Sequence, residues 1–197
     1  MPRRSSPPSV LIVASLLWLT LTAAALAADV WLGLWMIVLF PALAFAWVGL
    51  VAVSFWRTLA DGRRDALLTG VGLVVVAAAL VAWGGQLGTI GVRLRFMLHR
   101  AEYEAVTAQV SAGARPRASV GYQVDPGPPP RVAFVWDGLG DNWNGVVWDP
   151  SGVVATARGW GERPGDYTAS PEAKKLFGGD LVGCTHLRGA WYHCGFT

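Results

Sequence analysis

Three long apolar stretches in the first half of the chain constrain its fold more than any other feature. They run from residue 10 to 28, from 30 to 56 and from 66 to 90, and none of them contains Asp, Glu, Lys, Arg or His. A helix needs about 20 apolar residues to cross the hydrocarbon core of a bilayer. The sequence therefore predicts three transmembrane helices at about these positions, with the lipid bilayer as their partner.

The arginines beside these stretches predict the orientation of the chain. Arg3 and Arg4 precede the first stretch, and Arg57, Arg63 and Arg64 lie between the second and the third. Short loops rich in Lys and Arg stay in the cytoplasm. Three arginines after the third stretch oppose this pattern, but a long domain is translocated largely regardless of its charge. We therefore expect a multi-pass protein of the cell membrane, with a cytoplasmic N-terminus and an extracytoplasmic C-terminal domain.

The first stretch also fits a secretory signal peptide. Arg3 and Arg4 would form its basic start, and residues 25–27, Ala-Leu-Ala, its cleavage site. We favour an uncleaved helix, because the next apolar stretch begins directly after Asp29. Both interpretations place the C-terminal domain on the same side of the membrane.

The apolar stretches offer no ionisable group, which counts against a proton relay, an ion pathway or a transporter site. Gly84 and Gly88 form a GxxxG pattern, which favours close helix packing. The pattern leaves both a homodimer and an intramolecular seam open. Pro41 is expected to kink or tilt the overlong second helix.

The charge of the chain gives no sign of a nucleic-acid partner. The formal net charge is +3, but from Val92 to the end there are 11 Lys and Arg against 10 Asp and Glu, a net of +1. A nucleic-acid surface requires a concentrated basic patch. The basic excess belongs to the membrane half, so no nucleic acid is predicted.

Residues 92–113 predict an amphipathic helix that continues the third span. Its apolar face consists of Phe96, His99, Tyr103, Val106 and Val110, at alternating spacings of three and four. Three positions for this face stay open: on lipid headgroups, on the domain that follows, or on a partner. His99 is expected to be packed rather than to bind a metal.

The rest of the chain predicts a linker and a small domain. Residues 114–130 are rich in Gly and Pro and are typical of a linker, with a short strand at 119–124. Residues 131–197 predict a β-rich α+β domain. Within it, Asp-Pro-Ser-Gly at 149–152 predicts a type I turn in a β-hairpin, and the segment from Ser170 predicts a short helix. So small a unit needs more than its core for stability.

The chain has two cysteines, Cys184 and Cys194, and both lie in a predicted terminal hairpin that turns at Gly189. In that register the cysteines face each other and His186 faces Tyr192, and opposed positions suit a disulfide. Strand alternation divides the side chains between two faces. One face is expected to hold Val182, Cys184, His186, Tyr192, Cys194 and Phe196, and the other Trp191 and His193.

This division argues against a zinc site. Only Cys184, His186 and Cys194 would converge, whereas a structural zinc takes four ligands. An extracytoplasmic location also favours oxidised cysteines. We therefore predict a disulfide, with free thiols and a metal as less favoured alternatives. A catalytic thiol pair is the least favoured alternative, because the spacing is not CxxC and no thioredoxin-like βαβ pattern accompanies it.

Oxygen-bearing side chains gather at Asp137, Asp141, Asn142, Asn144 and Asp149. Such groups suit calcium, but their spacing does not fit an EF-hand, and the same residue types are common in turns. No metal and no cofactor are predicted. An envelope hydrolase that uses Asp137, Asp141 and His186 stays open as an alternative.

Five tryptophans follow residue 131, and burial in a thin core is expected for most of them. Trp143 and Trp160 stand in turn-like segments and are the two predicted to reach a binding surface. Asp137, Asp141 and His186 are the other candidate binding residues. No residue is predicted to be catalytic.

The segments DNWNG and DPSG, at 141–152, and WYHCGF, at 191–196, resemble segments of small bacterial membrane-anchored proteins that have no assigned activity. The resemblance covers mainly the last 70 residues and implies no activity, cofactor or site. We expect an integral membrane protein that presents a binding or scaffolding domain. A metal-dependent envelope hydrolase and an accessory subunit of a membrane complex are the alternatives.

Overall fold

A computed structural model describes residues 9–61, 64–139, 142–161 and 168–197. The chain divides into two compact units, Met1–Gly91 and Val92–Thr197. One helix continues across the boundary between them. Each unit is described separately below.

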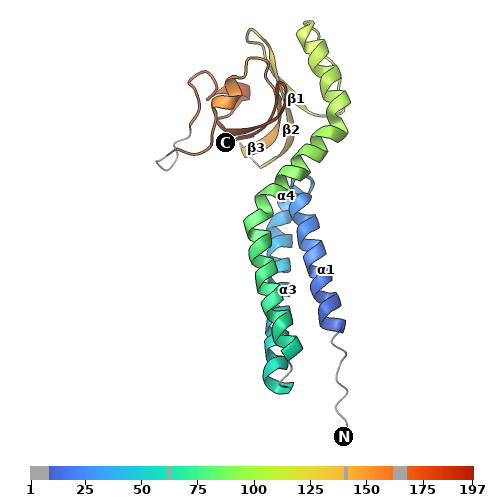
Figure 1. The fold of residues 1–197 in the computed structure, drawn as a ribbon. Helices are drawn as coiled ribbons and strands as arrows, with labels where there is room; N and C mark the ends of the chain where they lie inside the picture. Colours follow the sequence, from blue (N-terminus) through green and yellow to red (C-terminus); the bar gives the residue numbers. More distant parts are fainter. Residues whose placement is uncertain (1–8, 62–63, 140–141, 162–167) are drawn as a thin grey trace. The chain divides into compact units, whose positions relative to one another are not determined.

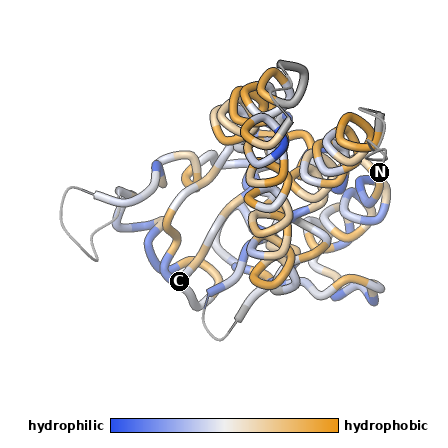
Figure 2. Tube along the Cα trace, turned by 90° about the horizontal axis from the view of Figure 1, so that it is seen from below, coloured by the Kyte–Doolittle hydropathy of each residue, from blue (hydrophilic) through white to orange (hydrophobic). Residues whose placement is uncertain are grey.

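The first unit is helical. Its elements are α1 (Ser9–Ala27), the short α2 (Asp29–Leu32), the 3₁₀ turn η1 (Gly33–Trp35), α3 (Met36–Asp61) and the beginning of α4 (Arg64–Ser111). Three of these helices, α1, α3 and α4, are long and apolar enough to cross a membrane. Their apolar character is visible as orange along the helical tube in Figure 2. Many of their large apolar side chains are exposed, as expected for helices whose surroundings are lipid.

The second predicted span begins later than the sequence suggested. Residues 30–35 form α2 and η1 rather than the start of a long helix. Gly33 adopts a positive φ of 48°, a conformation that interrupts a right-handed helix and that glycine adopts readily. The long helix α3 therefore starts at Met36, and Pro41 is its sixth residue.

The two glycines of the GxxxG pattern pack within the chain. A Cβ atom on Gly84 would lie 3.8 Å from Leu26 Cδ2, and one on Gly88 would lie 3.3 Å from Asp29 Oδ2. Both contacts join α4 to the end of α1 and the start of α2. The structure thus shows an intramolecular seam at these glycines, and a homodimer through them stays a prediction.

The second unit contains a five-stranded antiparallel sheet in the order β1-β2-β3-β5-β4. The strands are β1 (Tyr122–Asp125), β2 (Arg131–Leu139), β3 (Asn142–Trp148), β4 (Leu181–Arg188) and β5 (Trp191–Phe196). Figure 1 labels the first three. Two 3₁₀ turns, η2 (Val153–Thr156) and η3 (Leu176–Gly178), lie in the connection from β3 to β4.

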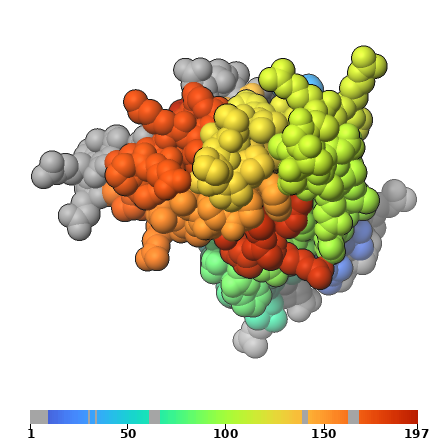
Figure 3. All heavy atoms as spheres, turned by 90° about the horizontal axis from the view of Figure 1, so that it is seen from above, coloured from blue at the N-terminus to red at the C-terminus, as the bar shows by residue number. Residues whose placement is uncertain are grey.

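One face of the sheet is covered by α4, and we call this contact the helix-side core. The predicted apolar face of residues 92–113 lies on the sheet, which is one of the three positions left open by the sequence. In Figure 3 the yellow-green end of α4 and the yellow region of β1 lie side by side. The helix-side core comprises Phe96, Tyr103, Val106, Val110, Val132, Phe134, Val146 and Trp191.

The other face of the sheet is covered by the long connection between β3 and β4, and we call this contact the loop-side core. Among the described residues of this connection there is no long helix, and η2, Ala157 and the turns at 171–178 supply the covering side chains. The loop-side core comprises Ala133, Val147, Val154, Ala157, Ala173, Leu176, Leu181, Cys194 and Phe196. The sheet is thus buried on both faces.

Two local predictions for this domain are wrong. The Asp-Pro-Ser-Gly segment does form a turn, but Val153–Thr156 continues as η2 rather than as a returning strand, and β3 pairs with β2 and β5. The segment after Ser170 forms successive turns that end in η3 instead of a regular helix. The predicted linker, in contrast, contains the expected strand β1, which pairs with β2.

Candidate functional site

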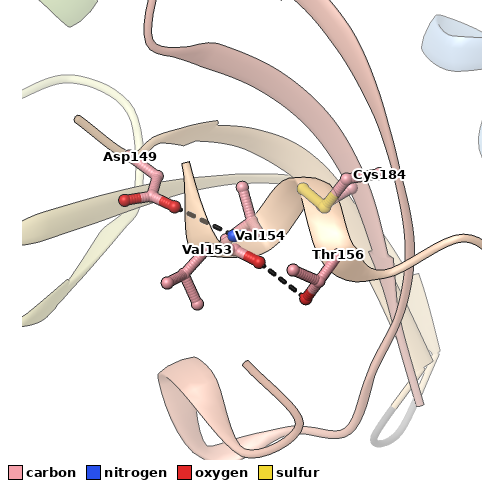
Figure 4. Close-up of a disulfide and its surroundings, with 6 residues drawn as sticks. Asp149, Val153, Val154, Thr156 and Cys184 are labelled. Carbon is pink, nitrogen blue, oxygen red and sulfur yellow. Dashed lines mark hydrogen bonds between the residues drawn. A yellow bond between two sulfur atoms is a disulfide. The ribbon is translucent and has the colours of Figure 1, made fainter. Parts of the chain in front are cut away.

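The terminal hairpin joins β4 to β5 around Gly189, whose φ is 55°. Cys184 faces Cys194 and His186 faces Tyr192. The two sulfur atoms are 2.02 Å apart, which is disulfide distance. Figure 4 shows the disulfide beside η2, and the Cys184 N–H donates a hydrogen bond to the Ala157 carbonyl at 2.9 Å. The disulfide thus lies where the hairpin meets the loop-side core.

The division of the hairpin between two faces agrees with the sequence except at its start. Cys194 and Phe196 enter the loop-side core, whereas Trp191 enters the helix-side core. A register shift between Leu181 and Gly183 changes the alternation at the beginning of β4. Leu181 is therefore fully buried in the loop-side core, and the predicted Val182 is not part of it.

The candidate residues Asp137 and His186 do not converge. Asp137 is on β2 and pairs with Asn144, whereas His186 is on the edge strand β4 near the turn. Their strands are separated by three strand spacings of about 4.8 Å each. His186 is exposed, with Nε2 2.9 Å from the Gly189 carbonyl oxygen and its ring edge-on to Tyr192. Asp141, the third candidate, lies outside the described residues.

The two candidate tryptophans lie in different environments. Trp143 is half-buried and stacks on Phe196 with ring centroids 3.8 Å apart, so it contributes to the loop-side core. Trp160 is 62% exposed. Of these two tryptophans, Trp160 is the one that presents a large apolar surface to the outside of its unit.

The sequence did not reveal a buried ionic cluster around Arg131. Its guanidinium bonds to Asp125 Oδ2 at 2.7 Å, to Glu172 Oε1 at 2.8 Å and to Asp149 Oδ1 at 3.3 Å. Burial lowers the pKa of Arg131, but its hydrogen bonds and the surrounding carboxylates outweigh this effect and raise it. This cluster joins β1, β2 and the β3–β4 connection, so its role is structural.

A second cluster that the sequence did not predict lies between the sheet and the first turns of the α4 segment that covers it. The Trp136 indole N–H donates to Tyr103 Oη at 2.8 Å. The Arg95 guanidinium carbon lies 4.7 Å from the centroid of the Trp136 ring, within cation–π distance. On the neighbouring side, the His193 ring lies 5.3 Å from Trp136. We call Arg95, Tyr103, Trp136 and His193 the Trp136 cluster.

His193 is the unusual member of the Trp136 cluster. Its Nε2 is buried without a hydrogen-bond partner among the described residues, and so is Oδ1 of Asn144 on the adjacent strand. Burial, followed by the positive charge of Arg95, lowers the pKa of His193 to about 4. The imidazole is therefore neutral at pH 7 and suits a single hydrogen bond to a polar group rather than proton transfer.

The Trp136 cluster is assembled from parts of the chain that no short motif connects. Arg95 comes from α4, Trp136 from β2 and His193 from β5. The sequence did place Trp191 and His193 on the face opposite the cysteines. The sequence contained no sign of the register shift between Val135 and Asp137 of β2, and such bulges re-aim neighbouring side chains.

Searches against protein-family models, curated proteins and solved structures give no match for this chain.

Proposed function

We propose that the chain is an integral membrane protein that presents its C-terminal domain outside the cytoplasm as a binding or scaffolding module. The observation that carries this proposal is α4, whose 48 residues begin in the apolar helical unit and end on the sheet. The same helix thus contributes an apolar segment to the first unit and a sheet-packing segment to the second, which suits a domain that is anchored in a membrane.

The cysteine pair and the arginine pattern support the proposed side of the membrane. Cys184 and Cys194 are at disulfide distance, and such bonds persist mainly in oxidising compartments. The cytoplasm keeps thiols reduced. Three arginines, at 57, 63 and 64, lie between α3 and α4 or at their ends, where the positive-inside rule favours the cytoplasm. Both arguments support the proposed location of the sheet domain outside the cytoplasm.

The exposed Trp160 supports a binding role for the domain. Large aromatic side chains are enriched at protein interfaces because they bury much apolar area at little entropic cost. Trp160 lies in the connection that covers the loop-side face of the sheet. The partner contact is thus proposed on the loop side, whereas α4 occupies the helix side.

Cysteine accessibility in intact cells tests the proposed location. An impermeant maleimide should label Cys184 and Cys194 only after reduction with a reductant that does not enter the cell. A variant with serine at both positions is the matched control for background labelling. Labelling that requires permeabilised cells but no reductant would show reduced cysteines in the cytoplasm and would contradict the proposal.

A groove among the membrane helices favours a second candidate, an accessory subunit of a larger membrane complex. The groove has a volume of about 550 Å³ and is lined by apolar residues of α1, α3 and α4, including Trp18, Trp47 and Val81. Its two indole N–H groups already donate to carbonyl oxygens, Trp18 to Leu43 and Trp47 to Leu73. Such a lining suits an apolar helix of a partner. Crosslinking from Val81 in intact membranes tests this candidate, and recovery of the chain without a crosslinked partner would oppose it.

A further inference from the structure

The side of α4 that points away from the sheet is apolar in the first turns of the second unit. Leu94, Met97 and Leu98 are 46%, 61% and 68% exposed, respectively. On the opposite side of the same turns, Val92 and Phe96 are buried. The helix therefore carries two apolar sides here, and only one of them is covered by the sheet.

The turns of α4 that carry Leu94, Met97 and Leu98 directly follow a part of the helix that contacts the connection between α1 and α3. Gly88 and Gly91 of α4 contact this connection and the end of α1: a Cβ on Gly88 would lie 3.3 Å from Asp29 Oδ2, and one on Gly91 would overlap the Ala27 carbonyl oxygen. The connection also carries an exposed Trp35. Polar groups and tryptophans between two spans are typical of a membrane–water interface. Gly91 thus marks the interface on α4.

The exposed apolar side ends a short distance beyond Gly91. Leu98 is seven residues along the helix from Gly91, a rise of about 10 Å. Beyond Leu98 the same side carries Ala101 and Ala105, which are exposed but small. Headgroup layers occupy about 5–7 Å on each side of a bilayer, and interfacial helices bury their apolar side chains about 5–10 Å deep. The extent of the large side chains therefore matches a headgroup layer rather than a long helix–helix seam.

The charges around this side complement lipid phosphate. Arg93 is exposed and adjoins Leu94 in the chain. Arg100, three residues after Met97 on the helix, is half-exposed and pairs with Glu104 at 2.7 Å. Arg95, in contrast, points to the sheet, where its Nη2 donates to the Trp136 carbonyl at 3.4 Å. An arginine beside exposed apolar groups extends its stem along them and places its guanidinium among phosphates.

We propose that the exposed side of α4 from Arg93 to Arg100 is a lipid-contact band, in which Leu94, Met97 and Leu98 enter the headgroup–acyl boundary and Arg93 binds lipid phosphate. This inference rests on the proposed membrane location. It adds that α4 is immersed in the headgroup layer where it already packs on the sheet.

Fluorescence quenching in liposomes tests this band with the full-length chain. The fluorophore NBD is attached to a single introduced cysteine in Leu98→Cys, Ala108→Cys or Val81→Cys, with the native cysteines left oxidised. The liposomes are phosphatidylcholine with a phospholipid that carries a nitroxide near its headgroup. We expect the probe at 98 to be quenched at least about twofold more than the probe at 108, because only the former lies at interfacial depth.

The probe at Val81 separates this inference from the proposed membrane location. Val81 is 85% exposed within a helix long and apolar enough to span, so a nitroxide placed deep in the acyl chains should quench it. If this probe is quenched but the probe at 98 behaves like the probe at 108, the band is wrong and the membrane location stands. If neither 81 nor 98 is quenched, both proposals are wrong.

Two further results decide what covers this side of α4 and whether Arg93 binds lipid phosphate. Blue-shifted emission at 98 without quenching by lipid would show that a second copy of the chain covers this side, and would overturn the lipid-contact band. In the Leu98→Cys background, Arg93→Gln should reduce headgroup-level quenching, whereas the exposed Arg117→Gln should leave it unchanged. Equal quenching in these two variants would exclude phosphate binding by Arg93.

Discussion

Arg131 Nε lies 3.3 Å from Oδ1 of Asp149, and both side chains are almost completely buried. Asp149 also accepts hydrogen bonds from the Ser151 N–H and the Val154 N–H, each at 2.9 Å, and Figure 4 shows the latter. Burial by itself would raise the pKa of Asp149, but a hydrogen bond from the Ser151 hydroxyl, the two N–H bonds and the charge of Arg131 lower it. One carboxylate therefore fixes both the turn after β3 and the start of η2.

Loss of the Asp149 carboxylate should strongly destabilise the domain. Asp149→Ala leaves the buried Val154 N–H and the part-buried Ser151 N–H without their acceptor. It also removes a buried partner of Arg131, so we expect a loss of about 3–5 kcal/mol in the free energy of unfolding. Glu172→Ala is a matched control, because Glu172 bonds to the same guanidinium but its side chain is 63% exposed. Its expected cost is below about 1 kcal/mol. Urea unfolding of the detergent-solubilised chain, monitored by protease susceptibility, measures the loss in each variant. Equal losses in Asp149→Ala and Glu172→Ala would contradict the structural role assigned to Asp149.

His193 should make the stability of the domain depend on pH. Its pKa is about 4 in the folded chain and about 6.5 when unfolded, so the unfolded chain binds the extra proton between these values. Stability is then complete above about pH 6.5 and declines as the pH falls toward 4. From pH 7 to pH 5 the loss from this group amounts to about 2 kcal/mol.

The variant His193→Gln isolates this effect, since it keeps a polar side chain that does not titrate. Its free energy of unfolding should change less between pH 7 and pH 5 than that of the unaltered chain. His186→Gln is the control, because His186 is exposed at the hairpin turn. If both variants retain the full pH dependence, His193 is not its source.

The features that the sequence predicted well depend only on residues that are close to one another along the chain. The apolar stretches need only length and composition, and α1, α3 and α4 are long and apolar enough to span. The facing of Cys184 and Cys194 follows from the turn at Gly189 and strand alternation. The sheet-facing side of α4 follows from helical periodicity, although periodicity did not show which surface covers it.

The features that the sequence did not predict depend on distant partners. After Asp149 the local signals permitted a returning strand, but β5 occupies that edge of β3, and the chain winds into η2 instead. Likewise, the Trp136 cluster unites residues about 40 and 60 positions apart in the chain. Its members become neighbours only through the sheet order and the bulge in β2.

The disulfide should stabilise the domain without being required for its fold. Cys184 and Cys194 are ten positions apart, and closing so short a loop in the unfolded chain is worth about 2–3 kcal/mol. Replacement of both cysteines by serine should therefore lower the free energy of unfolding by about this amount, because both cores of the sheet stay in place. Reductant should produce a similar loss in the unaltered chain and none in the double variant. A loss caused by reductant in the double variant would show that another effect is responsible.

Gly91 should be essential for the close approach of α1 and α4. A Cβ atom at this position would overlap the carbonyl oxygen of Ala27, whereas one at Gly85 of the same helix meets no atom within 4 Å. Gly85→Ala should be neutral or stabilise the helix by up to about 1 kcal/mol, since alanine is the better helix former. Gly91→Ala should cost about 1–3 kcal/mol, because α1 must move away from its place on α4. The thermal midpoint of the full-length chain in one detergent compares the two variants. A Gly91→Ala chain as stable as Gly85→Ala would show that α1 does not pack on α4 at this point.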